Sequence, residues 1–161
     1  MSENKSQVTS SQSQAEGIIK AISISKEKGI KKANVKQAIL KEDFGIIGDA
    51  HAGTKNRQVS LLAVESIKKM QEKGLKVGPG DFAENITTEG FDLLSLELGD
   101  RFRIGKDVEL QISQIGKVCH TRCNIYYQAG DCVMPKEGIF VKVLKGGKVK
   151  VGDSIKILCI K

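Results

Sequence analysis

Long apolar runs and aromatic side chains are scarce in this sequence. Tryptophan is absent, proline occurs twice, and aromatic residues make up 4% of the 161 residues. No stretch approaches the roughly 18 consecutive apolar residues that a membrane helix needs. Residues 1–16 are Ser- and Gln-rich and hold no apolar signal-peptide core. We therefore expect a cytoplasmic protein that has no membrane partner.

The remaining composition is that of a globular chain. Hydrophobic residues make up 40% and charged residues 28% of the sequence, which excludes collagen-like and disordered chains. The length suits one domain. We expect residues 1–16 to form a flexible polar tail and residues 17–161 to form a single domain. Because β-branched runs alternate with turns supplied by 17 glycines, the domain should be built from strands.

The apolar pattern predicts where those strands lie. We expect strands at 17–24, 35–39, 59–62, 102–104, 108–112, 139–144 and 154–160, with an extended segment at 82–88 and a glycine-broken irregular segment at 41–53. The helical spacing of Ala63, Ile67 and Met70 before Gly74 predicts a helix over 63–73. Many short strands with one helix favour a mainly β fold: a small closed or nearly closed antiparallel β-barrel with one or two short helices.

The positive charge is concentrated in one part of the chain. The net charge is +7, and residues 101–161 hold 12 basic and 5 acidic residues. Such an excess suits an anionic partner, for example a nucleic acid or a phosphorylated small molecule. We do not expect a nucleic-acid partner, because only Tyr126 and Tyr127 are available as adjacent aromatics for stacking and no recognised binding motif is present.

Three cysteines and a histidine lie close together in the sequence. They are Cys119, His120, Cys123 and Cys132. Thiolates are soft ligands that suit zinc, copper(I), iron–sulfur clusters and molybdenum-type centres. Zinc is an alternative, although this spacing is unlike the usual paired zinc knuckles. The cysteines could also be small buried apolar residues.

A reactive or metal-ligating thiolate is the third interpretation. Lys117, His120 and Arg122 lie beside Cys119, and neighbouring positive charge lowers the pKa of a thiol. Cys159 belongs to an alternating apolar strand and is expected in the core.

Two further stretches concentrate polar residues among glycines. The first, 48–57, holds Asp49, His51, Lys55 and Arg57, and glycine loops of this kind bind anions through backbone amides. The second, 78–87, holds a Gly-Pro-Gly-Asp turn followed by Glu84 and Asn85. Each stretch on its own is equally typical of an ordinary solvated turn.

Taken together and in this order, the stretches resemble the MOSC domain, named for the molybdenum-cofactor sulfurase C-terminal domain. Residues 45–53 read Gly-x-x-Gly-Asp-x-His-x-Gly, Arg57 and a Val-x-Leu strand follow, and 79–85 read Pro-Gly-Asp-Phe-x-Glu-Asn. Residues 98–105 continue the pattern, and Cys119 follows a strand as the family's single cysteine does. The resemblance covers about residues 17–160 and is to the short stand-alone bacterial type.

The resemblance implies a barrel of the pyruvate-kinase-like type that handles molybdenum cofactor or its sulfur. Cys119 would be the catalytic residue, as a persulfide carrier or a direct metal ligand, with Cys123 as a second candidate metal ligand. Partners would be molybdenum-cofactor biosynthesis enzymes or molybdoenzymes. Enzymatic activity, as a sulfur transferase or a molybdenum-dependent enzyme, would need partner proteins. Pyridoxal phosphate enters by family association only, because the chain is too short for the domain that holds it.

The resemblance also implies a set of cofactor-binding residues. The phosphate of the pterin would be met by Lys55, Arg57 and Arg122, since cationic side chains bind phosphate well. Asp49 and His51 would orient a ligand or shuttle a proton.

Glu84 and Asn85 would offer hydrogen bonds to the pterin edge, or would instead fix the loops of the barrel rim. An alternative function is a non-catalytic module that binds zinc or an oxyanion through the Cys/His cluster. Tight stoichiometric zinc would favour that alternative.

Overall fold

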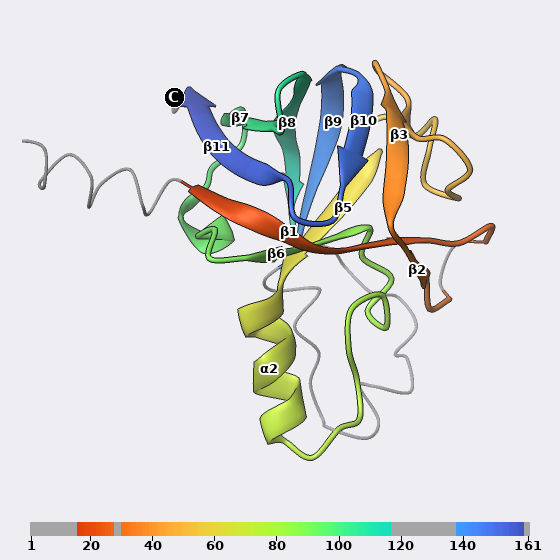
Figure 1. Cartoon of the computed structure of the whole chain (residues 1–161), viewed down its shortest axis with the longest axis vertical. Coiled ribbons are helices and arrows are strands. Elements are labelled where there is room, and N and C mark those ends of the chain that lie inside the picture. The colour runs from red at the N-terminus through yellow and green to blue at the C-terminus, as the bar shows by residue number, and fades with distance from the viewer. Residues whose placement is uncertain (1–15, 28–29, 117–137, 160–161) are drawn as a thin grey trace, which may run out of the picture.

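The described part of the chain is a closed barrel with one α-helix outside it. The computed structural model describes residues 16–27, 30–116 and 138–159 (Figure 1). The seven strands of the barrel follow one another in the order β1, β11, β7, β8, β9, β5, β6 and back to β1. Their bounds are β1 Glu16–Ile24, β5 Val59–Ala63, β6 Ile86–Glu89, β7 Arg101–Ile104, β8 Val108–Ile115, β9 Ile139–Lys145 and β11 Ser154–Cys159. The prediction of a mainly β barrel is confirmed.

One pair of barrel strands departs from the expected antiparallel arrangement. β5 and β6 are parallel, with Leu61 opposite Ile86. A parallel pair needs a crossover connection, and helix α2 (Val64–Glu72) supplies it directly after β5. The predicted helix is thus confirmed, and its extension away from the barrel is visible in Figure 1. Within the described residues the remaining barrel pairs are antiparallel.

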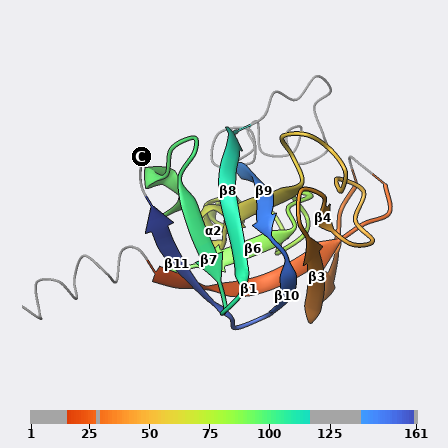
Figure 2. The same cartoon turned by 90° about the horizontal axis from the view of Figure 1, so that it is seen from above.

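The strand β5 is buried on both faces because it separates two cores. Val59, Leu61 and Ala63 point into the barrel interior, while Leu62 joins a second cluster under α2. That second cluster contains Leu62, Ile67, Met70, Phe82 and Phe140. The barrel core is aliphatic, apart from two phenylalanine rings, Phe91 and Phe102, whose centroids lie 5.5 Å apart. Figure 2 shows the strands curving around this interior.

A small second sheet covers one side of the barrel. It consists of β10 (Gly147–Lys150), β3 (Gln37–Lys41) and β4 (Gly45–Ile46), in that order. Its inner side chains Leu40, Ile46 and Val149 belong to the barrel core. β2 (Ala33–Val35) pairs instead with β1. The single strand expected at 35–39 is therefore wrong: the chain passes from one sheet to the other at Lys36.

The other predictions differ from the structure at element ends. The described residues also contain a short 3-10 helix, η1 (Leu93–Ser95). β4 interrupts the segment 41–53, which was expected to be irregular. Glu16 already lies in β1, and residues 1–15 of the expected tail lie outside the described residues. No helix in the described part of the chain is long and apolar enough to cross a membrane.

Candidate functional site

The Gly-Asp-x-His motif forms a tight turn directly after β4. The carboxylate of Asp49 shapes that turn, because its Oδ2 accepts a hydrogen bond from the backbone N–H of His51 at 3.0 Å. Its Oδ1 accepts another from the N–H of Ser25 at 3.0 Å. Thr54 Oγ1 donates to the carbonyl of His51 at 2.9 Å and closes the turn on the other side. One carboxylate therefore joins this loop to the end of β1.

Asp49 is neutralised by a buried lysine that we did not single out in the sequence. Lys32 Nζ lies 2.9 Å from Asp49 Oδ1, and both side chains are 0% exposed. Burial alone would raise the pKa of the Asp49 carboxyl. The side chains of His51 and Lys32 and the N–H groups of His51 and Ser25 outweigh that effect, so the pKa lies far below its ordinary value. The Asp49 carboxyl is ionised, and its side chain has no exposed surface for a ligand.

His51 is the more accessible member of the motif. Its side chain is 14% exposed, and its Nδ1 lies 3.6 Å from Asp49 Oδ2. That separation is too long for a hydrogen bond, and Nδ1 is buried without a hydrogen-bond partner among the residues that the structure describes. The exposed part of the ring therefore lies away from Nδ1.

Arg57 lies farther along the loop that joins β4 to β5. Its Nε donates to Gln114 Oε1 at 3.1 Å, and its guanidinium carbon lies 5.3 Å from the centre of the Phe140 ring. These contacts hold the guanidinium against β8 and β9 while leaving it partly exposed. Lys55, two residues earlier, is exposed. The loop thus presents two cations.

Arg57 also lies beside both ends of the cysteine-bearing segment. The N–H of Gly116 donates to the carbonyl of Gly138 at 2.7 Å, and Gln114 Nε2 donates to the carbonyl of Gly116 at 2.9 Å. Predicted site residues Cys119, Arg122 and Cys123 lie outside the described residues, as do His120 and Cys132. Among the described residues no cluster of three or more potential metal ligands occurs.

Glu84 is sealed inside the Pro-Gly-Asp-Phe-x-Glu-Asn loop. It is 0% exposed, and it accepts hydrogen bonds from the N–H groups of Gly80 and Phe82 and from Thr87 Oγ1. Burial raises the pKa of its carboxyl above the ordinary value, although these hydrogen bonds oppose the rise. The contacts are those of a residue that fixes its own loop.

Asn85 makes an equally complete set of contacts. Its Oδ1 accepts from the N–H and the hydroxyl of Ser60, at 3.0 and 3.2 Å, and its Nδ2 donates to the carbonyl of Ser23 at 3.0 Å. It is 0% exposed and links β1, β5 and the start of β6. A direct role for Glu84 and Asn85 at a pterin edge stays a prediction, and their contacts favour the alternative role of holding the rim loops.

Replacing Glu84 with glutamine should change how stability depends on pH. Because the folded-state pKa of Glu84 is raised, its protonation stabilises the fold below about pH 4.3, the unfolded value. That contribution is lost as the pH rises through the folded pKa. Glu84→Gln has no such loss, so its stability relative to wild type should be more favourable at pH 7 than at pH 4. Urea denaturation at both pH values measures this.

The exposed Glu97 provides the control for that experiment, since the same chemical change there, Glu97→Gln, should alter stability by no more than about 0.5 kcal/mol. If the free energy of unfolding of Glu84→Gln differs from that of the wild type by the same amount at pH 4 and pH 7, the raised pKa of Glu84 is contradicted.

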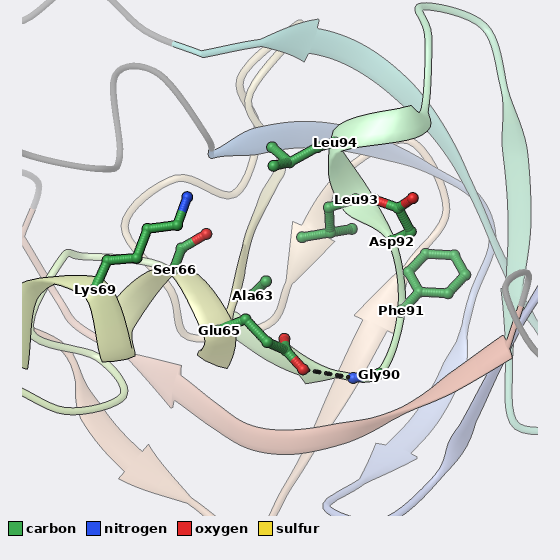
Figure 3. Close-up of a pocket in the computed structure, with 9 residues that line it drawn as sticks. All are labelled: Ala63, Glu65, Ser66, Lys69, Gly90, Phe91, Asp92, Leu93 and Leu94. Carbon is green, nitrogen blue, oxygen red and sulfur yellow. Dashed lines mark hydrogen bonds between the residues drawn. The ribbon is translucent and has the colours of Figure 1, made fainter.

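A cavity of the described structure lies elsewhere. It has a volume of about 330 Å³ and is open between α2 and the segment that leads into η1 (Figure 3). It is lined by Ala63, Glu65, Ser66, Lys69, Gly90, Phe91, Asp92, Leu93 and Leu94. None of the predicted site residues lines it. The predicted site residues are instead supported by hydrogen bonds with three residues that the motifs did not include: Lys32, Ser60 and Gln114.

Comparisons with known proteins agree with this architecture. The YuaD protein from Bacillus subtilis superposes with a TM-score of 0.74 at 19% identity, covering 88% of this chain and 95% of that one. YiiM from Geobacillus stearothermophilus gives 0.67 at 19% identity, covering 89% and 75%. YiiM from Escherichia coli gives 0.62 at 19% identity, covering 88% and 70%. At these identities the likeness shows a shared fold.

A search of the curated proteins found no match to the chain. The family model described as "MOSC domain" matches residues 48–156, which is more than half of the sequence. That span contains the Asp49 turn, the Glu84 loop and strands β5 to β10. The chain therefore belongs to the MOSC domain family, which is associated with the molybdenum cofactor.

Proposed function

We propose that this protein binds molybdenum cofactor, or carries sulfur to it, with the Cys119 thiolate as metal ligand or persulfide carrier. The observation that carries the proposal is the position of Arg57, which lies beside the strand ends from which the segment containing Cys119 departs. Cys119 is three residues beyond Gly116 in the sequence, and three residues span at most about 11 Å.

The exposed groups of the loop fit the phosphate of a pterin cofactor. A guanidinium can donate two parallel hydrogen bonds to phosphate oxygens. Arg57 uses its Nε to donate to Gln114, and within the described part of the chain its terminal nitrogens are left for a ligand. Lys55 adds a second, flexible positive charge. A Cβ at Gly48 or Gly53 would have no contact closer than 3.6 Å. The turn between them therefore has room for a ligand to approach the backbone.

The chain's own residues would bind and orient the group. Arg57 and Lys55 would hold the phosphate, and His51 would accept or donate one hydrogen bond at its exposed edge. When bound, the cofactor would supply the metal centre for oxygen- or sulfur-transfer chemistry. In the sulfur-carrier role, the Cys119 thiolate would attack the outer sulfur of a donor persulfide. One S–S bond would form while another broke, and the donor thiolate would leave, so that no external oxidant is needed.

Anaerobic co-expression with cofactor-producing enzymes tests the proposal. Molybdenum is measured by mass spectrometry and the pterin by fluorescence after oxidation, with a parallel assay for a Cys119 persulfide. We expect near-stoichiometric pterin or persulfide in the wild type, and its loss in Cys119→Ser. Neither species in the wild type would overturn the proposal, and tight stoichiometric zinc would establish the zinc-site alternative.

Arg57→Met should weaken pterin retention at least about tenfold, because one charge-assisted contact contributes about 1.5–3 kcal/mol. The exposed Arg101 on β7 supplies the matched control, and Arg101→Met should retain the pterin as the wild type does. Equal retention by both variants would remove Arg57 from the site.

A further inference from the structure

Lys32 connects the two motif loops of the candidate site. It precedes β2 and lies outside the segment matched by the family model. Its backbone N–H donates to the carbonyl of Gly80 at 2.9 Å. Its Nζ donates to Asp49 Oδ1 and to Ser25 Oγ, each at 2.9 Å. One residue therefore holds the Asp49 turn and the Gly80 turn together.

A buried ion pair is weak evidence for stabilisation. Replacing such a pair by apolar residues of similar volume is often neutral or stabilising, because both charges must be desolvated. The side chains of Lys32 and Asp49 are nonetheless both 0% exposed, and Lys32 Nζ lies 2.9 Å from Asp49 Oδ1. The effect of this pair on its exposed neighbour, His51, offers a more specific reason for it.

The ionisation state of the Asp49 carboxyl affects which nitrogen of a neutral His51 ring carries the proton. Asp49 Oδ2 is the acceptor that faces Nδ1, at 3.6 Å, and Nδ1 has no other partner among the described residues. An ionised carboxylate at that position favours the tautomer with the proton on Nδ1. A protonated carboxyl would remove that preference. The lowered pKa of Asp49, to which Lys32 contributes, is consistent with the ionised form.

We propose that Lys32 is a positioning residue for His51: by keeping Asp49 ionised, it holds the imidazole proton on Nδ1 and leaves the lone pair of Nε2 as a hydrogen-bond acceptor. The ligand group recognised by Nε2 is then an N–H or O–H donor, such as the edge of a pterin ring. The significance for ligand binding rests on the function proposed above, whereas the effect on the ring does not.

Nitrogen-15 NMR of the imidazole side chains tests this directly. The sequence contains two histidines, so the His120→Gln variant assigns the remaining signals to His51. At a pH where the ring is neutral, the wild type should show Nδ1 protonated and Nε2 unprotonated. A wild-type His51 that carries its proton on Nε2 would overturn the proposal without any further variant.

The Lys32→Met variant then tests whether the lysine causes the preference for a proton on Nδ1 of His51. Without its counter-ion the buried Asp49 carboxyl should take up a proton, and the His51 tautomers should shift towards Nε2–H. Lys31→Met is the matched control, since Lys31 is the adjacent and exposed lysine and its loss should leave the tautomer unchanged. Lys32→Arg keeps the charge and should keep Nδ1–H.

A folded Lys32→Met protein with the wild-type tautomer would contradict the proposal. If Lys32→Met fails to fold, the wild-type and Lys32→Arg spectra still decide it. The measurement uses cofactor-free protein, so its result is separate from that of the proposed function. Failure to bind pterin together with a wild-type Nδ1–H ring would overturn only the cofactor role.

Discussion

Replacing Asp49 with asparagine is expected to lower the free energy of unfolding by about 3–5 kcal/mol, because the Lys32 ammonium then stays buried without its counter-ion. The amide also has a single acceptor oxygen, whereas the carboxylate accepts on both oxygens from Ser25, Lys32 and His51. The N–H groups of the new amide would take the place of one carboxylate oxygen, so one of these donors would face another donor instead of an acceptor. Urea denaturation at neutral pH measures the loss.

Asp92→Asn is the control for the same chemical change at an exposed position, and it should alter stability by no more than about 0.5 kcal/mol.

The dependence of stability on pH in acid provides a second measurement. Because the folded-state pKa of Asp49 is lowered, its contribution is present above about pH 4 and is lost as the pH falls. The difference between wild type and Asp49→Asn should therefore shrink in acid. A difference that is small at neutral pH would show that the ion pair does not support the turn.

The local pattern predicted most strands because it depends on residues that are near one another in the sequence. The alternation along β7 and β8 reflects side chains that point in turn into the barrel and away from it. The parallel pairing of β5 with β6 has no such signature, since it follows from where α2 returns the chain. β10 was not predicted because its four residues include one buried side chain, Val149, between two exposed lysines.

The motifs located the candidate loops and left open what each side chain does there. Asp49, Glu84 and Asn85 are residue types that bind ligands and that also bind backbone N–H groups. The structure shows all three engaged with the chain itself, while His51, Lys55 and Arg57 keep exposed surface. Lys32 is one of several lysines between 26 and 36, and nothing in the sequence distinguishes it from its exposed neighbour Lys31. Its role depends on contacts that are 17 and 48 residues away.

Gly80→Ala should be the second strongly destabilising substitution, because the backbone at Gly80 is both left-handed and tightly enclosed. Its φ is +93°, and an added Cβ would clash with the carbonyl oxygen of Lys32 and lie 3.0 Å from Ser23 Oγ. The left-handed conformation costs a non-glycine residue about 1–2 kcal/mol. Overpacking against a backbone atom adds about 1–3 kcal/mol. We expect a total loss of more than about 2 kcal/mol in urea denaturation.

Gly78→Ala, two residues earlier in the same turn, isolates the cause of that loss. A Cβ at Gly78 meets nothing within 4 Å, so this variant should unfold at nearly the wild-type urea concentration. Equal stability of the two variants would show that the Gly80 turn is not held against Lys32. If Gly80→Ala folds, the displaced Lys32 backbone should also weaken the contact with Asp49 and shift His51 towards Nε2–H. A change in one motif loop would then be detected on a side chain of the other, which the shared contact with Lys32 requires.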